Sequence, residues 1–205
     1  ACWADSSVGQ LGDGTGGPDR SALGPVTVTG LDDAVEIVMG ASHACARREV
    51  GGVVCWGDGS RGQLGHGMEG VSLVPVEALD LGDALRLHAG PTGRHTCARA
   101  FGTRDMRCWG DNENGQLGDG TSMRRSTAVD MFDIDMLTSA GVGEGHTCVL
   151  QGRRAYCVGS NRRGQLGDGS TVSATRATRV DLPEDVTALA AGFASSCALR
   201  VSGAV

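Results

Sequence analysis

The sequence predicts an all-β fold, a β-propeller built from four-stranded blades, on three observations. The tetrapeptide Gly-Gln-Leu-Gly occurs four times, beginning at Gly9, Gly62, Gly115 and Gly164, at intervals of 53, 53 and 49 residues. Short runs of strand-forming residues lie between glycine-rich turns. No window of about ten residues or more has a convincing helical period. A fixed period of about 50 residues with four strands in each is the pattern of a propeller blade.

The first full unit shows how the strands are assigned. Its four runs cover residues 25–29, 35–39, 43–47 and 53–56, and we expect them to form one blade in this order. The segment 49–52 is a hairpin tip, because its two glycines reach positive φ at little steric cost. The Gly-Gln-Leu-Gly stretch is then a tight loop that carries the chain to the next unit.

Two further signatures accompany the tetrapeptide. Cys-Trp-Gly-Asp begins at Cys55 and Cys108, and Gly-x-x-His-x-Cys-Ala begins at Gly40. This combination resembles the repeat of the regulator of chromosome condensation family in its cysteine-bearing bacterial form, although Val158 replaces the tryptophan and Ser195 the histidine. The resemblance covers essentially the whole chain and implies one propeller domain over residues 1–205. Propellers of this family usually have seven blades, whereas this chain supplies four repeats.

The eight cysteines follow the repeat, and six of them fall into three pairs. In an antiparallel hairpin, residues at such spacings lie opposite each other, about 4.5 to 5.5 Å apart at Cα, within disulfide range. The expected disulfides, with separations of 10, 11 and 9 residues, are Cys45–Cys55, Cys97–Cys108 and Cys148–Cys157. Each would bracket the third and fourth strands of a blade. Disulfides indicate an oxidising compartment, so we expect an extracellular or cell-surface location.

The remaining cysteines, Cys2 and Cys197, leave two architectures open. Counted across joined chain ends, they are ten residues apart, like the internal pairs. A self-closed ring of four blades would therefore pair Cys2 with Cys197. The alternative, which family precedent favours, is part of a larger propeller of seven blades.

The sequence assigns no catalytic, cofactor-binding or metal site. A catalytic centre needs unlike groups in one place, whereas the repeated histidines are like groups that we expect to bond a neighbouring turn; they are His43, His95 and His146. The Asp-Gly pairs at Asp13, Asp119 and Asp168 lack the ligand spacing of a calcium loop, so turns are expected there.

Charge is distributed unevenly along the repeat. All 18 basic residues are arginine, and the net charge is −6. The hairpins between paired cysteines hold two acids, Glu49 and Asp105, and eight arginines, namely Arg47, Arg48, Arg99, Arg104, Arg107, Arg153, Arg154 and Arg200. The links between strands one and two hold no arginine and twelve acids, namely Asp32, Asp33, Glu36, Glu77, Asp80, Asp83, Asp130, Asp133, Asp135, Asp181, Glu184 and Asp185. We expect both sets of loops on one face.

These patterns favour a non-enzymatic, secreted or surface-displayed module that binds an unknown protein partner. The candidate contacts are Arg47, Arg48, Arg153 and Arg154 in the hairpins; mutual ion pairing on the surface is the competing interpretation. The acidic balance argues against nucleic acid. No run of about 18 apolar residues could span a membrane, and no small-molecule substrate is evident. The family resemblance implies an alternative, guanine-nucleotide exchange on a small GTPase.

Overall fold

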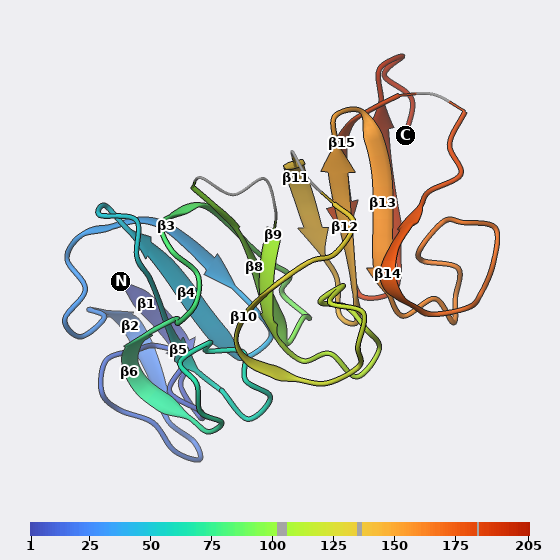
Figure 1. The fold of residues 1–205 in the computed structure, drawn as a ribbon. Helices are drawn as coiled ribbons and strands as arrows, with labels where there is room; N and C mark the ends of the chain where they lie inside the picture. Colours follow the sequence, from blue (N-terminus) through green and yellow to red (C-terminus); the bar gives the residue numbers. More distant parts are fainter. Residues whose placement is uncertain (102–105, 135–136, 184) are drawn as a thin grey trace.

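The computed structural model describes residues 1–101, 106–134, 137–183 and 185–205, and every regular element in them is a β-strand. Three four-stranded antiparallel sheets follow one another along the chain (Figure 1). Blade 1 contains β3 (Ala34–Met39), β4 (His43–Arg48), β5 (Val53–Gly57) and β6 (Ser72–Glu77). Blade 2 contains β7 (Ala84–Ala89), β8 (His95–Ala100), β9 (Met106–Gly110) and β10 (Arg125–Asp130). Blade 3 contains β11 (Leu137–Val142), β12 (His146–Gln151), β13 (Arg154–Gly159) and β14 (Ala174–Arg179).

A two-stranded sheet lies at each end of this array. The N-terminal half-blade contains β1 (Cys2–Asp5) and β2 (Ser21–Val26), and the C-terminal half-blade contains β15 (Val186–Ala191) and β16 (Ser196–Arg200). The first strands β3, β7, β11 and β15 contact their neighbours in turn, so they form the inner side of the array. The all-β propeller class predicted from the repeat is confirmed.

The predicted order of strands within a blade was wrong by one strand. Of the run predicted at 25–29, only residues 25–26 lie in a strand, at the end of β2, which pairs with β1 and not with β3. The Gly-Gln-Leu-Gly loop therefore lies inside a blade, between its third and fourth strands, and the acidic segment after the fourth strand leads to the next blade. A repeat period fixes the length of the unit but not the strand at which a sheet begins.

Disulfides join the two middle strands of each complete blade. The bonds are Cys45–Cys55, Cys97–Cys108 and Cys148–Cys157, and the Cα atoms of each pair are 4.1 Å apart. Because of the shifted blade boundary, they link the second and third strands and not the third and fourth. A closed loop of this length contributes roughly 2.5 to 3 kcal/mol in the chain-entropy model.

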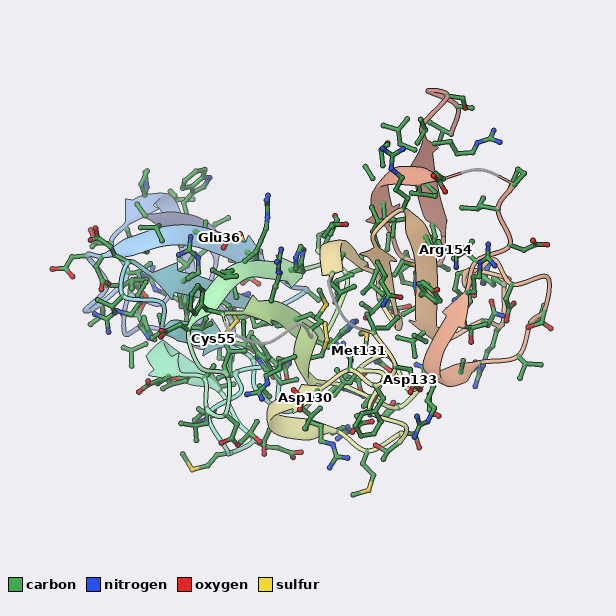
Figure 2. All side chains as sticks on the ribbon, turned by 45° about the horizontal axis from the view of Figure 1, so that its top comes forward. Glu36, Cys55, Asp130, Met131, Asp133 and Arg154 are labelled. Atoms are coloured by element: carbon green, nitrogen blue, oxygen red, sulfur yellow. A yellow bond between two sulfur atoms is a disulfide. The ribbon has the colours of Figure 1, made fainter. Side chains whose placement is uncertain are left out.

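The closed ring of four blades is not formed. Cys2 and Cys197 are both free thiols, on β1 and β16. Figures 1 and 2 show the two half-blades at opposite ends of an open array. The cysteines keep the spacing of the repeat, but in this structure they lie on sheets that are far apart.

Successive blades are held together at a seam built on the Gly-Gln-Leu-Gly loop. In the first seam, Trp56 of blade 1 donates its indole Nε1–H to the backbone oxygen of Gln10, at 3.0 Å. In the second, Trp109 of blade 2 bonds the oxygen of Gln63 in the same way, also at 3.0 Å. The loop's own leucine, such as Leu64, is buried beneath it. The leucine side chain of the loop thus packs into its own blade, and the glutamine backbone oxygen bonds the next blade.

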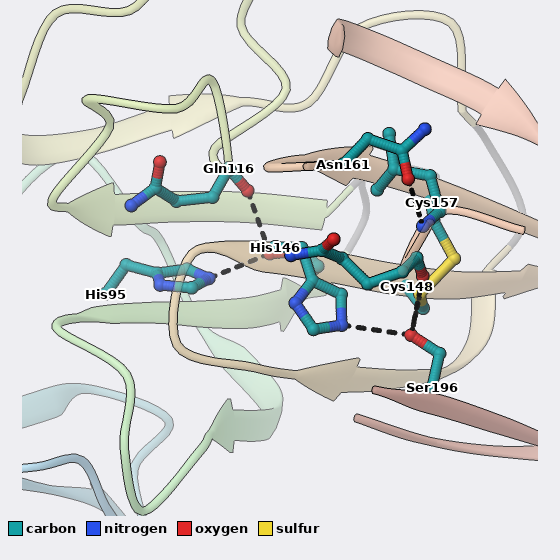
Figure 3. Close-up of a disulfide and its surroundings, with 10 residues drawn as sticks. His95, Gln116, His146, Cys148, Cys157, Asn161 and Ser196 are labelled. Carbon is teal, nitrogen blue, oxygen red and sulfur yellow. Dashed lines mark hydrogen bonds between the residues drawn. A yellow bond between two sulfur atoms is a disulfide. The ribbon is translucent and has the colours of Figure 1, made fainter. Parts of the chain in front are cut away.

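The repeated histidines complete these seams (Figure 3). His95 Nε2 lies 2.8 Å from Thr147 Oγ1 of blade 3, whose hydroxyl donates to the backbone oxygen of Gln116 at 2.8 Å. Because the hydroxyl proton is used there, His95 must donate its Nε2–H. His43 and His146 meet Thr96 and Ser196 in the corresponding places. The expected partner, a neighbouring turn, was wrong, because each ring bonds a strand hydroxyl of the next blade.

We predict that the protein loses stability as the pH falls from about 6.5 toward 4. Burial lowers the pKa of His43 to about 4, and burial with the nearby His43 and His146 lowers the pKa of His95 to about 3. The unfolded chain takes up protons near pH 6.5 while these rings stay neutral, so the free energy of unfolding falls by up to about 1.4 kcal/mol per pH unit for each ring. Urea unfolding at several pH values measures this slope. His95→Gln should flatten it, and a stability independent of pH in this range would contradict the prediction.

We also predict that the seam tryptophans dominate stability. Trp109 is fully buried, so Trp109→Ala should lower the free energy of unfolding by about 3 to 5 kcal/mol. Phe101 is 69% exposed, so Phe101→Ala should change it by less than about 0.5 kcal/mol. Chemical denaturation of both variants makes the comparison, and equal effects would argue against a seam role for Trp109.

Candidate partner-binding site

The basic hairpins and the acidic links lie on one face of the array, as expected from the charge pattern. Ala84 N, after the link from blade 1, donates to Gly51 O in the hairpin of blade 1 at 2.8 Å. Val186 N likewise donates to Arg153 O in the hairpin of blade 3 at 2.9 Å. The acidic segments are connections between blades, not between strands one and two of one blade. Of the charges expected here, Arg104, Asp105, Asp135 and Glu184 lie outside the described residues.

Two of the four candidate arginines are committed to acids of their own blade. Arg48 Nε lies 2.9 Å from both carboxylate oxygens of Asp33, which raises the pKa of Arg48. Arg47 Nε lies 3.2 Å from Glu36 Oε2. That same carboxylate oxygen accepts the backbone N–H of Leu87 in blade 2 at 3.2 Å. Glu36 thus links the inner strands β3 and β7, and the competing interpretation, mutual ion pairing, describes Arg47 and Arg48.

The other two candidates line a groove between blade 3 and the C-terminal half-blade. The groove has a volume of about 620 Å³, and its lining includes Arg153, Arg154 and Arg179. Its apolar surface comes from residues such as Ala155, Val180 and Val186. Figure 2 shows Arg154 far from Glu36, so the structure does not gather the four predicted arginines into one site.

Among the described residues that line the groove, arginines outnumber carboxylates. Arg153 Nη1 lies 4.0 Å from Asp185 Oδ2, and both side chains are more than half exposed. Within the described parts of the chain, Arg154 and Arg179 form no ion pair. Three guanidinium groups thus face one described carboxylate, in contrast to the acidic balance of the whole chain.

Arg179 was not among the predicted contacts, because it lies at the end of a strand and not in a hairpin loop. The last residues of the outer strands β6, β10 and β14 are Glu77, Asp130 and Arg179. In blade 2 this position is an acid, and Asp130 Oδ1 lies 2.7 Å from Arg107 Nε. An alignment of the outer strands would have revealed the reversal of charge in blade 3, which leaves the groove basic.

The polar loops on the opposite face are occupied by their own contacts. Asp119 Oδ1 accepts the backbone N–H of Thr121 at 3.0 Å and the side-chain amide of Asn112 at 3.0 Å. Asp119 Oδ2 pairs with Arg125 at 2.6 Å. This Asp-Gly pair therefore forms a turn. No cluster of three or more metal-binding side chains occurs in the described residues.

Those residues also contain no helix of the length and apolar character needed to cross a membrane.

Comparisons with known proteins give a consistent result. Residues 34–63 match the model of the "Regulator of chromosome condensation (RCC1) repeat". The chain is 29% identical over 147 residues to the human E3 ubiquitin-protein ligase HERC2. This match covers 71% of this chain and 3% of HERC2. The match to the structure of yeast RCC1 (Prp20) bound to Kap60 has a TM-score of 0.81 at 19% identity. It covers 95% of this chain and 48% of that one.

A second solved structure with a similar fold is the ectodomain of a receptor kinase. The ectodomain of the receptor kinase CR4 from Physcomitrella patens matches with a TM-score of 0.56 and 24% identity, covering 86% of this chain and 40% of that one. The chain thus spans less than half of each of these relatives. With the four copies of the motif and the seam geometry, these matches identify the repeat of this chain as the regulator of chromosome condensation repeat.

Proposed function

We propose that this chain is a non-enzymatic binding module, secreted or displayed at a cell surface, that holds an acidic segment of a protein partner in the groove of Arg153, Arg154 and Arg179. The observation that carries the proposal is the charge of this groove, where three arginines face one described acid. Arginine is a frequent hot-spot residue in interfaces, and its planar guanidinium binds carboxylates in a bidentate fashion. The apolar floor would accept the aliphatic part of the same segment.

The comparisons support a scaffold for binding. Prp20, which has the same fold, is bound to Kap60 in its crystal structure. The CR4 structure, which has a similar fold, is that of an ectodomain. Three disulfides in the present chain agree with an oxidising location, whereas small GTPases act in the reducing cytosol. Guanine-nucleotide exchange therefore remains the second candidate.

The groove predicts a salt-dependent affinity for acidic peptides. A fluorescent peptide of about ten residues rich in glutamate serves as the probe. Arg153→Ala with Arg154→Ala should weaken its binding about five- to thirtyfold at low salt, because two exposed charge contacts of about 0.5 to 1 kcal/mol each are lost. The loss should shrink at about 0.3 M salt.

The matched control is Arg162→Ala with Arg163→Ala, which removes the same charge from exposed positions at the other end of β13. It should leave the affinity unchanged. Arg47→Ala with Arg48→Ala should destabilise blade 1 instead, because it removes the closest arginine partners of Glu36 and Asp33. Equal weakening by all three double variants would mean that only net charge attracts the peptide, and would remove the groove from the proposal.

The proposed location predicts that the six blade cysteines are oxidised in the native protein. Non-reducing peptide mapping of protein from its own source should recover Cys45 with Cys55, Cys97 with Cys108, and Cys148 with Cys157. Free thiols at all six positions would place the protein in a reducing compartment and favour the exchange-factor alternative.

A further inference from the structure

A pocket of about 300 Å³ lies on the face that carries the Gly-Gln-Leu-Gly loops. It is lined by these loops and by the inner turns, which join the first and second strands of each blade. Both lie at the opposite end of the strands from the hairpins, so the pocket is separate from the groove of Arg153, Arg154 and Arg179. Among the described residues, all its charged side chains belong to the complete blades. Its volume is at the lower limit for small-molecule sites.

The pocket opens where an ion pair of the preceding seam is replaced by two short side chains. Between blades 1 and 2, Arg61 Nη1 lies 3.2 Å from Asp111 Oδ1 across the seam. Between blades 2 and 3, the seam that Figure 3 shows, the same positions hold Asn114 and Ser160. The backbone confirms the equivalence, because Arg61 and Asn114 each donate their N–H to the loop glutamine. Asp111 and Ser160 each donate theirs to the residue before the histidine of their blade.

Two charged side chains stand on the inner turns around this space, at positions that are small elsewhere in the repeat. The residue before the blade histidine is Arg94 in blade 2, where the other complete blades have serine and glycine. The residue before that is Glu144 in blade 3, where the other complete blades have alanine and glycine. Both side chains line the pocket. Four departures from the repeat, two that make room and two that bring charge, therefore coincide in one place.

The other charges of the pocket neutralise one another. Arg61 Nη1 lies 2.9 Å from Glu113 Oε1 as well as 3.2 Å from Asp111 Oδ1. Arg124, from the same loop as these acids, pairs with Glu113 and lies 3.8 Å from Asp111 Oδ1. Hydrogen bonds from Arg124 and Arg61 hold the pKa of Glu113 below its usual range. Two guanidinium groups and two carboxylates thus satisfy each other along one wall.

Arg94 and Glu144 have no such partners. Both are exposed, and neither forms an ion pair with the other or with any group in the described parts of the chain. In the same parts of the chain, the hydroxyl groups of Thr92 and Ser160 and the side-chain amide of Asn114 also form no hydrogen bond. The pocket therefore presents one cation, one anion and three neutral polar groups, all available to a ligand.

We propose that this pocket binds a free α-amino acid, whose carboxylate meets Arg94 and whose ammonium group meets Glu144. Two unpaired charges of opposite sign in one pocket match a zwitterion, because an ion of either sign would leave one of them without a partner. The planar guanidinium of Arg94 can bind a carboxylate through two parallel hydrogen bonds. Asn114 and Ser160 supply neutral donors and acceptors for the remaining polar atoms of the ligand.

The probe for this site is L-leucine, because Ala41 and Phe193 give the pocket some apolar surface beside its charges. Two analogues each lack one charge: 4-methylpentanoate has no ammonium group, and 3-methylbutylamine has no carboxylate. Isothermal titration calorimetry of the protein should show binding of leucine. Both analogues should bind at least about tenfold more weakly, because each loses a hydrogen bond between charged groups.

Single variants identify which charge meets which group. Arg94→Gln should weaken the binding of leucine at least about tenfold but leave that of 3-methylbutylamine unchanged, because this amine has no carboxylate. Glu144→Gln should likewise weaken the binding of leucine but leave that of 4-methylpentanoate unchanged. The matched controls are Arg162→Gln and Glu69→Gln, which remove the same charges from exposed positions outside the pocket and should change nothing.

A double variant fills the pocket and leaves both of its free charges in place. Asn114→Arg with Ser160→Asp would rebuild the pair that Arg61 and Asp111 form at the preceding seam. The fold should therefore persist, as urea unfolding can verify, while the binding of leucine weakens at least about tenfold. Binding that survives this variant, or that responds equally to the controls, would overturn the proposal. Equal affinity for all three probes would also overturn it, as would a dissociation constant for leucine above about 10 mM.

Discussion

The backbone oxygen of the glutamine in each Gly-Gln-Leu-Gly loop is the acceptor on which the array depends. Gly62 has a φ of +83°, which turns the loop so that this oxygen faces the next blade. Gln63 holds the turn with its own side chain, whose Oε1 accepts the Arg61 backbone N–H at 2.8 Å. The oxygen then receives an indole N–H or a hydroxyl from the next blade. Because these groups are buried, leaving one unpaired would cost about 1 to 3 kcal/mol.

The sequence was sufficient to predict the propeller class and the disulfide pairing within each blade, because both depend on a pattern that recurs in every repeat. It did not reveal the strand at which a blade begins, because the repeat length is the same whichever strand is counted first. The observed pairing of β1 with β2 sets this boundary. The histidines show the same limit. The residue after the histidine position carries a hydroxyl in three units, at Thr96, Thr147 and Ser196. This repeated hydroxyl was a signal that a histidine of one blade bonds a hydroxyl of the next.

The candidate site was predictable only in part, for a physical reason. Arg47 and Arg48 carry the same hairpin signature as Arg153 and Arg154, but acids of blade 1 neutralise them. Whether a charge is available for a partner is decided by its neighbours across the sheet, and these are distant in sequence. The groove is basic because Arg179 replaces an acid at the end of an outer strand, a position where the fold tolerates either sign.

Since each seam joins a blade only to the one before it and the one after it, the array behaves as a linear chain of coupled units. A complete blade such as blade 2 is held by a seam on each side, so an opening of the backbone must break a seam before it spreads. Among the described strands, the amide protons of β5 and β9, each anchored by a tryptophan, should therefore exchange with solvent last. The cooperativity of unfolding in such a protein depends on how many blades unfold together before an intact seam limits the process.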